Sequence, residues 1–159
     1  MSFFKRAFLT ITLLAVAACG FTPVYGTGGS GSALQNSIEV IEPADRDAFL
    51  VTRRLEERLG RSSDPAYKLT LSVATAEEDL AVDREGDTAR FNLLGQADYA
   101  LVDQSTGKTV VSGRVDNFTS YSTTGTTVAT LAAQRDAQQR LMILLADMIV
   151  VRLLSADLT

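Results

Sequence analysis

The clearest pattern along the chain is an alternation of apolar and polar residues between positions 89 and 101. Every second position from Ala89 to Leu101 is apolar or glycine, while Arg90 and Asp98 are among the residues between them. A period of two residues indicates a β-strand that buries one face. So long a run favours an antiparallel sheet whose other face lies in water.

Shorter alternations predict two strands that precede this run. Residues 38–40 form one of them, which Pro43 ends, and residues 67–73 form the other. The second strand can continue through Val82 if a bulge shifts its phase. Residues 84–87 then make the turn into the long strand.

A fourth strand is expected after a turn at residues 103–108. It begins at Val111, and apolar residues alternate with polar ones as far as Val115. Phe118 and Tyr121 cannot both continue this alternation on the same face. The pattern therefore predicts a bulge in the last strand.

Two segments show apolar residues three and four positions apart, the spacing of a helix. Asp45 can cap a helix that ends near Leu59, with Gly60 as its stop. A long helix is expected over residues 128–154, polar in its first half and apolar almost all round in its second. The order β-α-β-β-β-α predicts an α+β fold, a two-layer sandwich with two helices packed on one face of a mostly antiparallel sheet.

The second half of the long helix carries more apolar surface than one sheet can cover. It is not expected to span a membrane, because its apolar run of about fourteen residues is interrupted by Asp147 and Arg152 and a span needs about 20. Most of this surface belongs in the core, and the rest is a candidate contact for a partner protein. The candidate partner contacts are Leu141, Leu144, Leu145, Met148 and Val151.

The amino terminus has the pattern of a secretion signal. Lys5 and Arg6 precede an apolar stretch over residues 7–18, which is too short to cross a bilayer. The last residues of this stretch and Cys19 read Val-Ala-Ala-Cys, which resembles the lipobox of bacterial lipoproteins. The resemblance implies that the thiol of Cys19 receives a diacylglyceryl group and that its amino group is acylated after cleavage. The alternatives are an uncleaved anchor helix, a core helix and a free structural cysteine.

These features divide the chain into three parts. Residues 1–18 are expected to be a cleaved signal peptide. Residues 19–35 are expected to be a lipidated N-terminus and a Gly/Ser-rich tether, since residues 26–32 read GTGGSGS. Residues 36–159 are expected to fold as one α/β domain.

Composition and charge argue against several functions. The net charge is −4, and it becomes −6 if the signal is removed with Lys5 and Arg6, so nucleic-acid binding is not expected. The chain has no histidine and one cysteine, so a Ser-His-Asp triad and a zinc site of histidine or cysteine ligands are excluded. We expect a protein that is not an enzyme and that uses no cofactor and no metal.

Two segments resemble the LptE family of lipopolysaccharide-assembly lipoproteins. The stretch CGFTPVYG, which begins at Cys19, resembles the start of the mature family members, and residues 128–154 resemble the last helix of the short alphaproteobacterial type. The resemblance implies a periplasm-facing protein, lipid-anchored in the cell outer membrane. It also implies that the protein assembles with and plugs the β-barrel translocon LptD and helps to insert lipopolysaccharide into the outer leaflet.

An acidic protein can contact an anionic glycolipid only where basic residues stand out locally. The candidates on the wet sheet face and at the hairpin tips are Arg84, Arg90, Lys108 and Arg114. Ordinary solvated charge is the alternative for each of them. Two other functions stay open, an auxiliary lipoprotein of an ABC-type phospholipid transport system and an envelope lipoprotein that binds peptidoglycan.

Overall fold

Four strands form one open sheet. The computed structural model describes residues 30–82, 88–123 and 126–156, so the turn expected at residues 84–87 lies outside the described residues. The strands lie side by side in chain order: β1 (Ile38–Val40), β2 (Tyr67–Val82), β3 (Thr88–Asp103) and β4 (Thr109–Ser122). β2, β3 and β4 pair antiparallel, whereas β1 pairs parallel with β2. The sheet is therefore mixed, and mostly antiparallel as expected.

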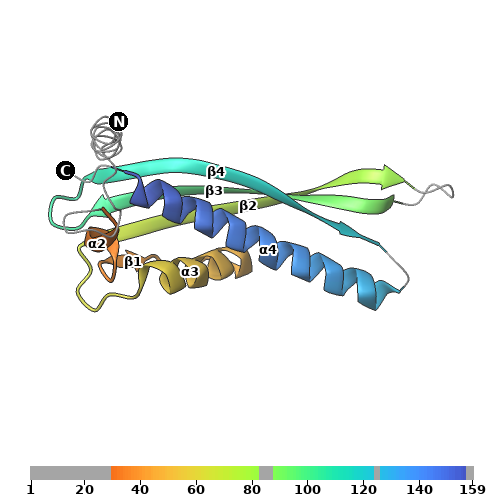
Figure 1. Ribbon diagram of the computed structural model, residues 1–159, viewed down its shortest axis with the longest axis horizontal. Coiled ribbons are helices and arrows are strands. Elements are labelled where there is room, and N and C mark those ends of the chain that lie inside the picture. The colour runs from red at the N-terminus through yellow and green to blue at the C-terminus, as the bar shows by residue number, and fades with distance from the viewer. Residues whose placement is uncertain (1–29, 83–87, 124–125, 157–159) are drawn as a thin grey trace, which may run out of the picture.

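The helices complete a second layer. They are α2 (Ser30–Leu34), α3 (Arg46–Leu59) and α4 (Thr127–Leu154). α4 packs on β3, β4 and α3, and Figure 1 shows it crossing the strands diagonally. α3 contributes Val51 and Leu55 to the same buried core as Leu141 and Leu145 of α4. The predicted α+β sandwich is confirmed.

The ends of both long helices follow from local chemistry. The side chain of Asp45 accepts a hydrogen bond from the Ala48 N–H at 2.8 Å, which caps the start of α3. α3 ends at Leu59 and is capped by Gly60, whose φ of +80° favours glycine and whose added Cβ would clash with Oδ1 of Asn36. The hydroxyl of Thr126 caps α4 by accepting from the Ala129 N–H at 3.3 Å.

Odd-numbered residues of the three long strands face the helices. Leu69, Ala97 and Leu101 have no exposed surface, and Val115 is 2% exposed. The even-numbered residues of 70–78 in β2, 92–100 in β3 and 112–120 in β4 point the opposite way. We call the surface that they form the outer sheet face.

The folded domain begins before residue 36. Residues 30–34 were expected in the tether, yet they form α2, and Leu34 is fully buried in the core. The Gly/Ser composition hid this helix because burial of one leucine, rather than helix propensity, stabilises so short a segment. The rest of the expected tether, residues 19–29, lies outside the described residues.

The bulge expected in β4 is absent between Val111 and Ser122. The pairing of β3 with β4 is continuous there, and the register shift between these strands lies at Leu101 and Val102. Phe118 points to the outer sheet face and is 57% exposed, while Tyr121 faces the helices and is buried. The prediction was wrong because it required both aromatic rings to be buried. The bulge expected in β2 is confirmed by shifts between Asp79 and Val82.

Candidate functional site

A stripe of apolar residues lies on the solvent side of α4. Leu144 is 40% exposed and Val151 is 62% exposed. Met148 between them is half-buried, and its sulfur lies 3.4 Å from Nδ2 of Asn117. Residues spaced by four and then three positions share one face of a helix. We call Leu144, Met148 and Val151 the α4 stripe, and it is the part of the predicted partner contact that the fold leaves accessible.

Leu141 and Leu145 are not accessible to a partner. Both side chains are fully buried where α4 packs on β3. A Cβ added to Gly95 would lie 2.9 Å from Cδ2 of Leu141 and 3.0 Å from Cδ1 of Leu145, so the helix approaches the bare backbone closely. Their assignment as partner contacts was wrong. An almost uniformly apolar helix gives no periodicity from which its rotation about its own axis could be predicted.

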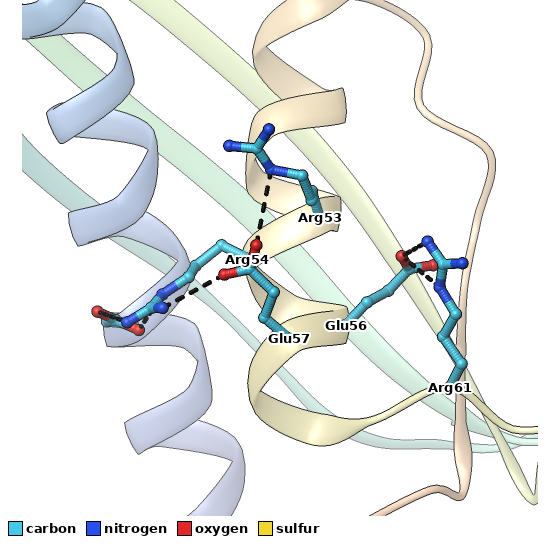
Figure 2. A network of polar contacts seen from close by, with 6 residues as sticks. Arg53, Arg54, Glu56, Glu57 and Arg61 are labelled. Atoms are coloured by element: carbon cyan, nitrogen blue, oxygen red, sulfur yellow. Dashed lines mark hydrogen bonds and ion pairs between the residues drawn. The ribbon is translucent and has the colours of Figure 1, made fainter.

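An ion-pair network beside the α4 stripe ties α4 to α3. Two nitrogens of Arg54 donate to the two carboxylate oxygens of Asp147 at 3.0 and 3.1 Å, and Arg58 donates to the same carboxylate at 3.1 Å. The pKa of Arg54 is raised, mainly by its hydrogen bond with Asp147. Figure 2 shows Arg54 reaching away from α3 towards α4. Figure 2 also shows the ion pair Arg53–Glu57 within α3 and, on the side of α3 away from α4, the ion pair of Glu56 with Arg61, which follows the helix.

The outer sheet face carries an open apolar hollow of about 440 Å³. One row of cross-strand neighbours in it is Ala76, Leu94 and Phe118. The next row is Ala74, Gln96 and Asp116. Sequence reasoning missed this surface because it treated the even-numbered positions as uniformly polar. The available signal was Leu94, a large apolar residue at a position expected to face water, together with Phe118, which falls on the same face if β4 continues without a bulge.

The candidate basic residues do not form one site. Arg90 lies near the start of β3, and Lys108 lies in the turn that follows its end at Asp103. The thirteen residue steps from Arg90 to Asp103 span roughly 43 Å at the rise of a β-strand. These two cations therefore cannot hold the same headgroup. Arg84 lies outside the described residues.

Arg114 is committed to a partner within the sheet. Its Nε and Nη2 atoms donate to the two carboxylate oxygens of Asp98 at 2.7 and 3.0 Å, across neighbouring strands. The hydrogen bond from Arg114 lowers the pKa of Asp98, and the same bond raises the pKa of Arg114. The fork-to-fork geometry neutralises the charge of Arg114 locally.

The remaining predicted features lie largely outside what the structure describes. Cys19, the expected lipidation site, is among residues 1–29. Among residues 30–82, 88–123 and 126–156, no helix is long and apolar enough to cross a membrane. In the same ranges, no three residues of the types His, Cys, Asp and Glu are grouped so as to hold a metal ion.

The sequence profile of the lipopolysaccharide-assembly family LptE matches residues 35–153. The chain belongs to the LptE family. This membership supports a role in lipopolysaccharide assembly. Comparison with curated protein sequences finds no match.

Solved structures share the fold of this LptE-family chain. A Caulobacter crescentus CB15 protein described as a lipoprotein is 30% identical, with a TM-score of 0.67 over 82% of this chain and 96% of its own. Rare lipoprotein B from Shewanella oneidensis is 20% identical, with a TM-score of 0.56 over 74% of this chain and 91% of its own. A minor lipoprotein from Acinetobacter baumannii is 16% identical, with a TM-score of 0.53 over 76% of this chain and 90% of its own. All three proteins carry the description lipoprotein in their names.

Proposed function

We propose that the protein is an outer-membrane lipoprotein that assembles with and plugs the β-barrel LptD and helps to insert lipopolysaccharide into the outer leaflet. The observation that carries the proposal is the family match over residues 35–153, which includes β1 through most of α4. The proposed anchor is the acylated Cys19. Long acyl chains contribute about 0.8 kcal/mol for each buried methylene, so several chains would make release from the membrane negligible.

The dimensions of the domain are compatible with a plug. β3 has 16 residues and α4 has 28, which correspond to lengths of about 53 Å and about 42 Å. The sheet is four strands wide, which is about 15 Å between its edge strands. Figure 1 shows the resulting elongated body. A narrow body of this kind can enter the lumen of a large barrel along its length.

The α4 stripe is the proposed contact with the barrel wall. It combines an exposed apolar centre with charged residues at its side, because Asp147 and its arginine partners lie next to Leu144 and Val151. Protein interfaces commonly have this arrangement of an apolar core and a polar rim. For lipopolysaccharide, the commitment of Arg114 to Asp98 leaves Arg84, Arg90 and Lys108 as the proposed contacts. Arg90 and Lys108 would each meet a separate anionic group, and Arg84 lies outside the described residues.

Charged substitutions in the α4 stripe test this proposal. Leu144→Glu and Val151→Glu should reduce the amount of barrel protein that co-purifies in mild detergent by roughly tenfold or more, because a buried unpaired carboxylate disfavours the apolar contact. Leu131→Glu is the matched control. Leu131 is 45% exposed on α4, but thirteen residues before Leu144 it lies on a different side of the helix, about 220° away. Circular dichroism would establish that all three variants keep the fold.

Two results would argue against the proposal. Equal recovery of the barrel with the stripe variants and the control would remove the α4 stripe as the contact. Recovery of an inner-membrane ATPase complex in place of a barrel would favour the auxiliary lipoprotein of a phospholipid transport system.

A further inference from the structure

One edge of the sheet is left open over much of its length. β1 covers only the first residues of β2. There the backbone N–H of Tyr67 donates to the carbonyl oxygen of Ser37 at 3.0 Å, and the carbonyl oxygen of Leu69 accepts from the N–H of Ile41 at 2.9 Å. Beyond Leu69, the odd-numbered residues of β2 direct their N–H and C=O groups away from β3, because alternate residues of a strand bond to opposite sides. No backbone group of a described residue bonds to these outward groups at positions 71, 73, 75 and 77.

The open edge lacks the features that usually prevent strand addition. Residues 70–76 read TLSVATA, without charge, proline or glycine, and the bulge in β2 comes only after Asp79. Edge strands are normally protected by charged residues, prolines, bulges or a covering segment. From Ala74 to Leu80, β2 is exposed on both of its faces. The edge is therefore accessible as well as unpaired.

The opposite edge of the same sheet is partly capped. Oδ1 of Asn117 accepts from the outward N–H of Phe118 at 2.8 Å. Nη2 of Arg140 lies 3.5 Å from the outward carbonyl oxygen of Ser120. β4 thus satisfies some of its free backbone groups internally, whereas the described part of the chain offers none to the β2 edge.

The charges at the far end of this edge indicate what it can bind. Glu77, Glu78 and Asp79 follow the uncharged stretch, and their partners on β3 are Leu93, Asn92 and Phe91, none of them basic. Glu77 accepts hydrogen bonds from Tyr121 and Gln134. Glu78 and Asp79 are exposed. A second copy of this chain would place like charges together if it paired antiparallel about Glu78, and it would place Glu78 beside the uncharged Thr70 if it paired about Ala74. A strand with lysine or arginine at this position would place opposite charges together, which is more favourable than either arrangement.

The hollow on the outer sheet face adds a preference for an apolar residue. Ala74 and Ala76 separate the open edge from Leu94 and Phe118, and both are small. A strand added to β2 would lie about 4.8 Å from it. A large apolar side chain on that strand would pack over Ala76 towards Leu94 and remove apolar surface from water.

We propose that the edge of β2 from Thr70 to Asp79 binds an extended segment of a partner protein by strand addition. The segment carries a large apolar residue beside Ala76 and a lysine or arginine beside Glu78. Backbone hydrogen bonds to positions 71–77 supply affinity, and these two side chains supply specificity. This inference goes beyond the proposed plug and does not depend on LptD, so the two can fail separately.

A defined peptide tests the inference on the full chain in mild detergent. The probe is acetyl-KTLTVTLTK-amide, in which each terminal lysine lies two positions from a leucine, so that either strand direction can place leucine beside Ala76 and lysine beside Glu78. Its charge-reversed form, acetyl-ETLTVTLTE-amide, is the matched control. The lysine peptide should slow amide hydrogen exchange at Leu71, Val73, Thr75 and Glu77 by roughly tenfold or more, and the glutamate peptide should not. Raising the salt concentration should weaken the difference.

Two proline variants locate the site. Thr75→Pro removes an outward N–H without breaking the β2–β3 pairing, so it should abolish peptide binding. Ser112→Pro does the same on the β4 edge and should leave binding unchanged. If Thr75→Pro fails to fold, Glu78→Lys is the second variant, because it alters an exposed side chain and should shift preference towards the glutamate peptide.

The inference is overturned by any of four results. These are absence of protection at saturating lysine peptide, equal binding of both peptides, protection of the β4 edge instead, and protection without peptide that grows with protein concentration. The last result would identify a second copy of the chain as the occupant.

Discussion

Two adjacent leucines of α4 should differ strongly in how much the same substitution destabilises the fold. Leu145 is fully buried against Gly95, and Leu144 is 40% exposed in the α4 stripe. Leu145→Ala should lower the free energy of unfolding by about 3 kcal/mol, since it removes buried methyl groups and leaves a cavity. Leu144→Ala should lower it by less than about 1 kcal/mol, because its site is open to solvent and leaves no closed cavity.

Urea unfolding of the two variants, followed by far-UV circular dichroism, measures the difference. A loss of about 3 kcal/mol corresponds to a fall in Tm of roughly 10 °C for a domain of this size, so thermal melts give an independent check. The barrel pull-down should rank the variants in reverse, with Leu144→Ala the more impaired at a temperature where both are folded. Equal destabilisation by the two substitutions, or a nearly neutral Leu145→Ala, would refute the orientation of α4 in which Leu145 faces the sheet and Leu144 faces solvent.

Three further results are expected. Gly95→Val should cost about 1–3 kcal/mol in urea unfolding, because its Cβ would lie 2.9 Å from Leu141, and a cost below the error of the fit would contradict this packing. Arg114 lowers the pKa of Asp98 below its ordinary 3.8, so the pair stabilises the fold at neutral pH and stops doing so as pH falls through that lowered pKa. The stability difference between wild type and Asp98→Asn should therefore shrink on acidification, whereas a difference independent of pH would contradict the role of charge. Cys19→Ser should abolish the acylated N-terminal peptide in mass spectra and release the protein from membranes, and persistent membrane binding would indicate another anchor.

Periodicity was sufficient for the sheet and for the start of both long helices. The alternation from Leu93 to Leu101 has one buried set and one partly exposed set of residues, which is what the structure shows. Asp45 and Gly60 bound α3 because capping and a positive φ are local properties of the chain. α2 was missed because its stability depends on burying Leu34 against distant segments, which local sequence does not encode.

The candidate surfaces were harder to predict than the fold. The apolar half of α4 was correctly expected to exceed the core, but only packing against β3 determines that Leu144 and Val151 are exposed and that Leu141 and Leu145 are buried. The open edge of β2 depends on where β1 stops pairing, which follows from the path of the chain after Ile41. Such features arise from tertiary contacts, so neither residue type nor spacing could indicate them.

The most direct test of the proposed function is the mass of the complex that the untagged barrel forms with the tagged full-length protein, purified from outer membranes in mild detergent. The account predicts one large β-barrel protein bound to one copy of this chain, with Cys19 acylated. A chain that purifies alone from outer membranes, or with an inner-membrane ATPase, would contradict the account and leave membership of the LptE family without the proposed plug function.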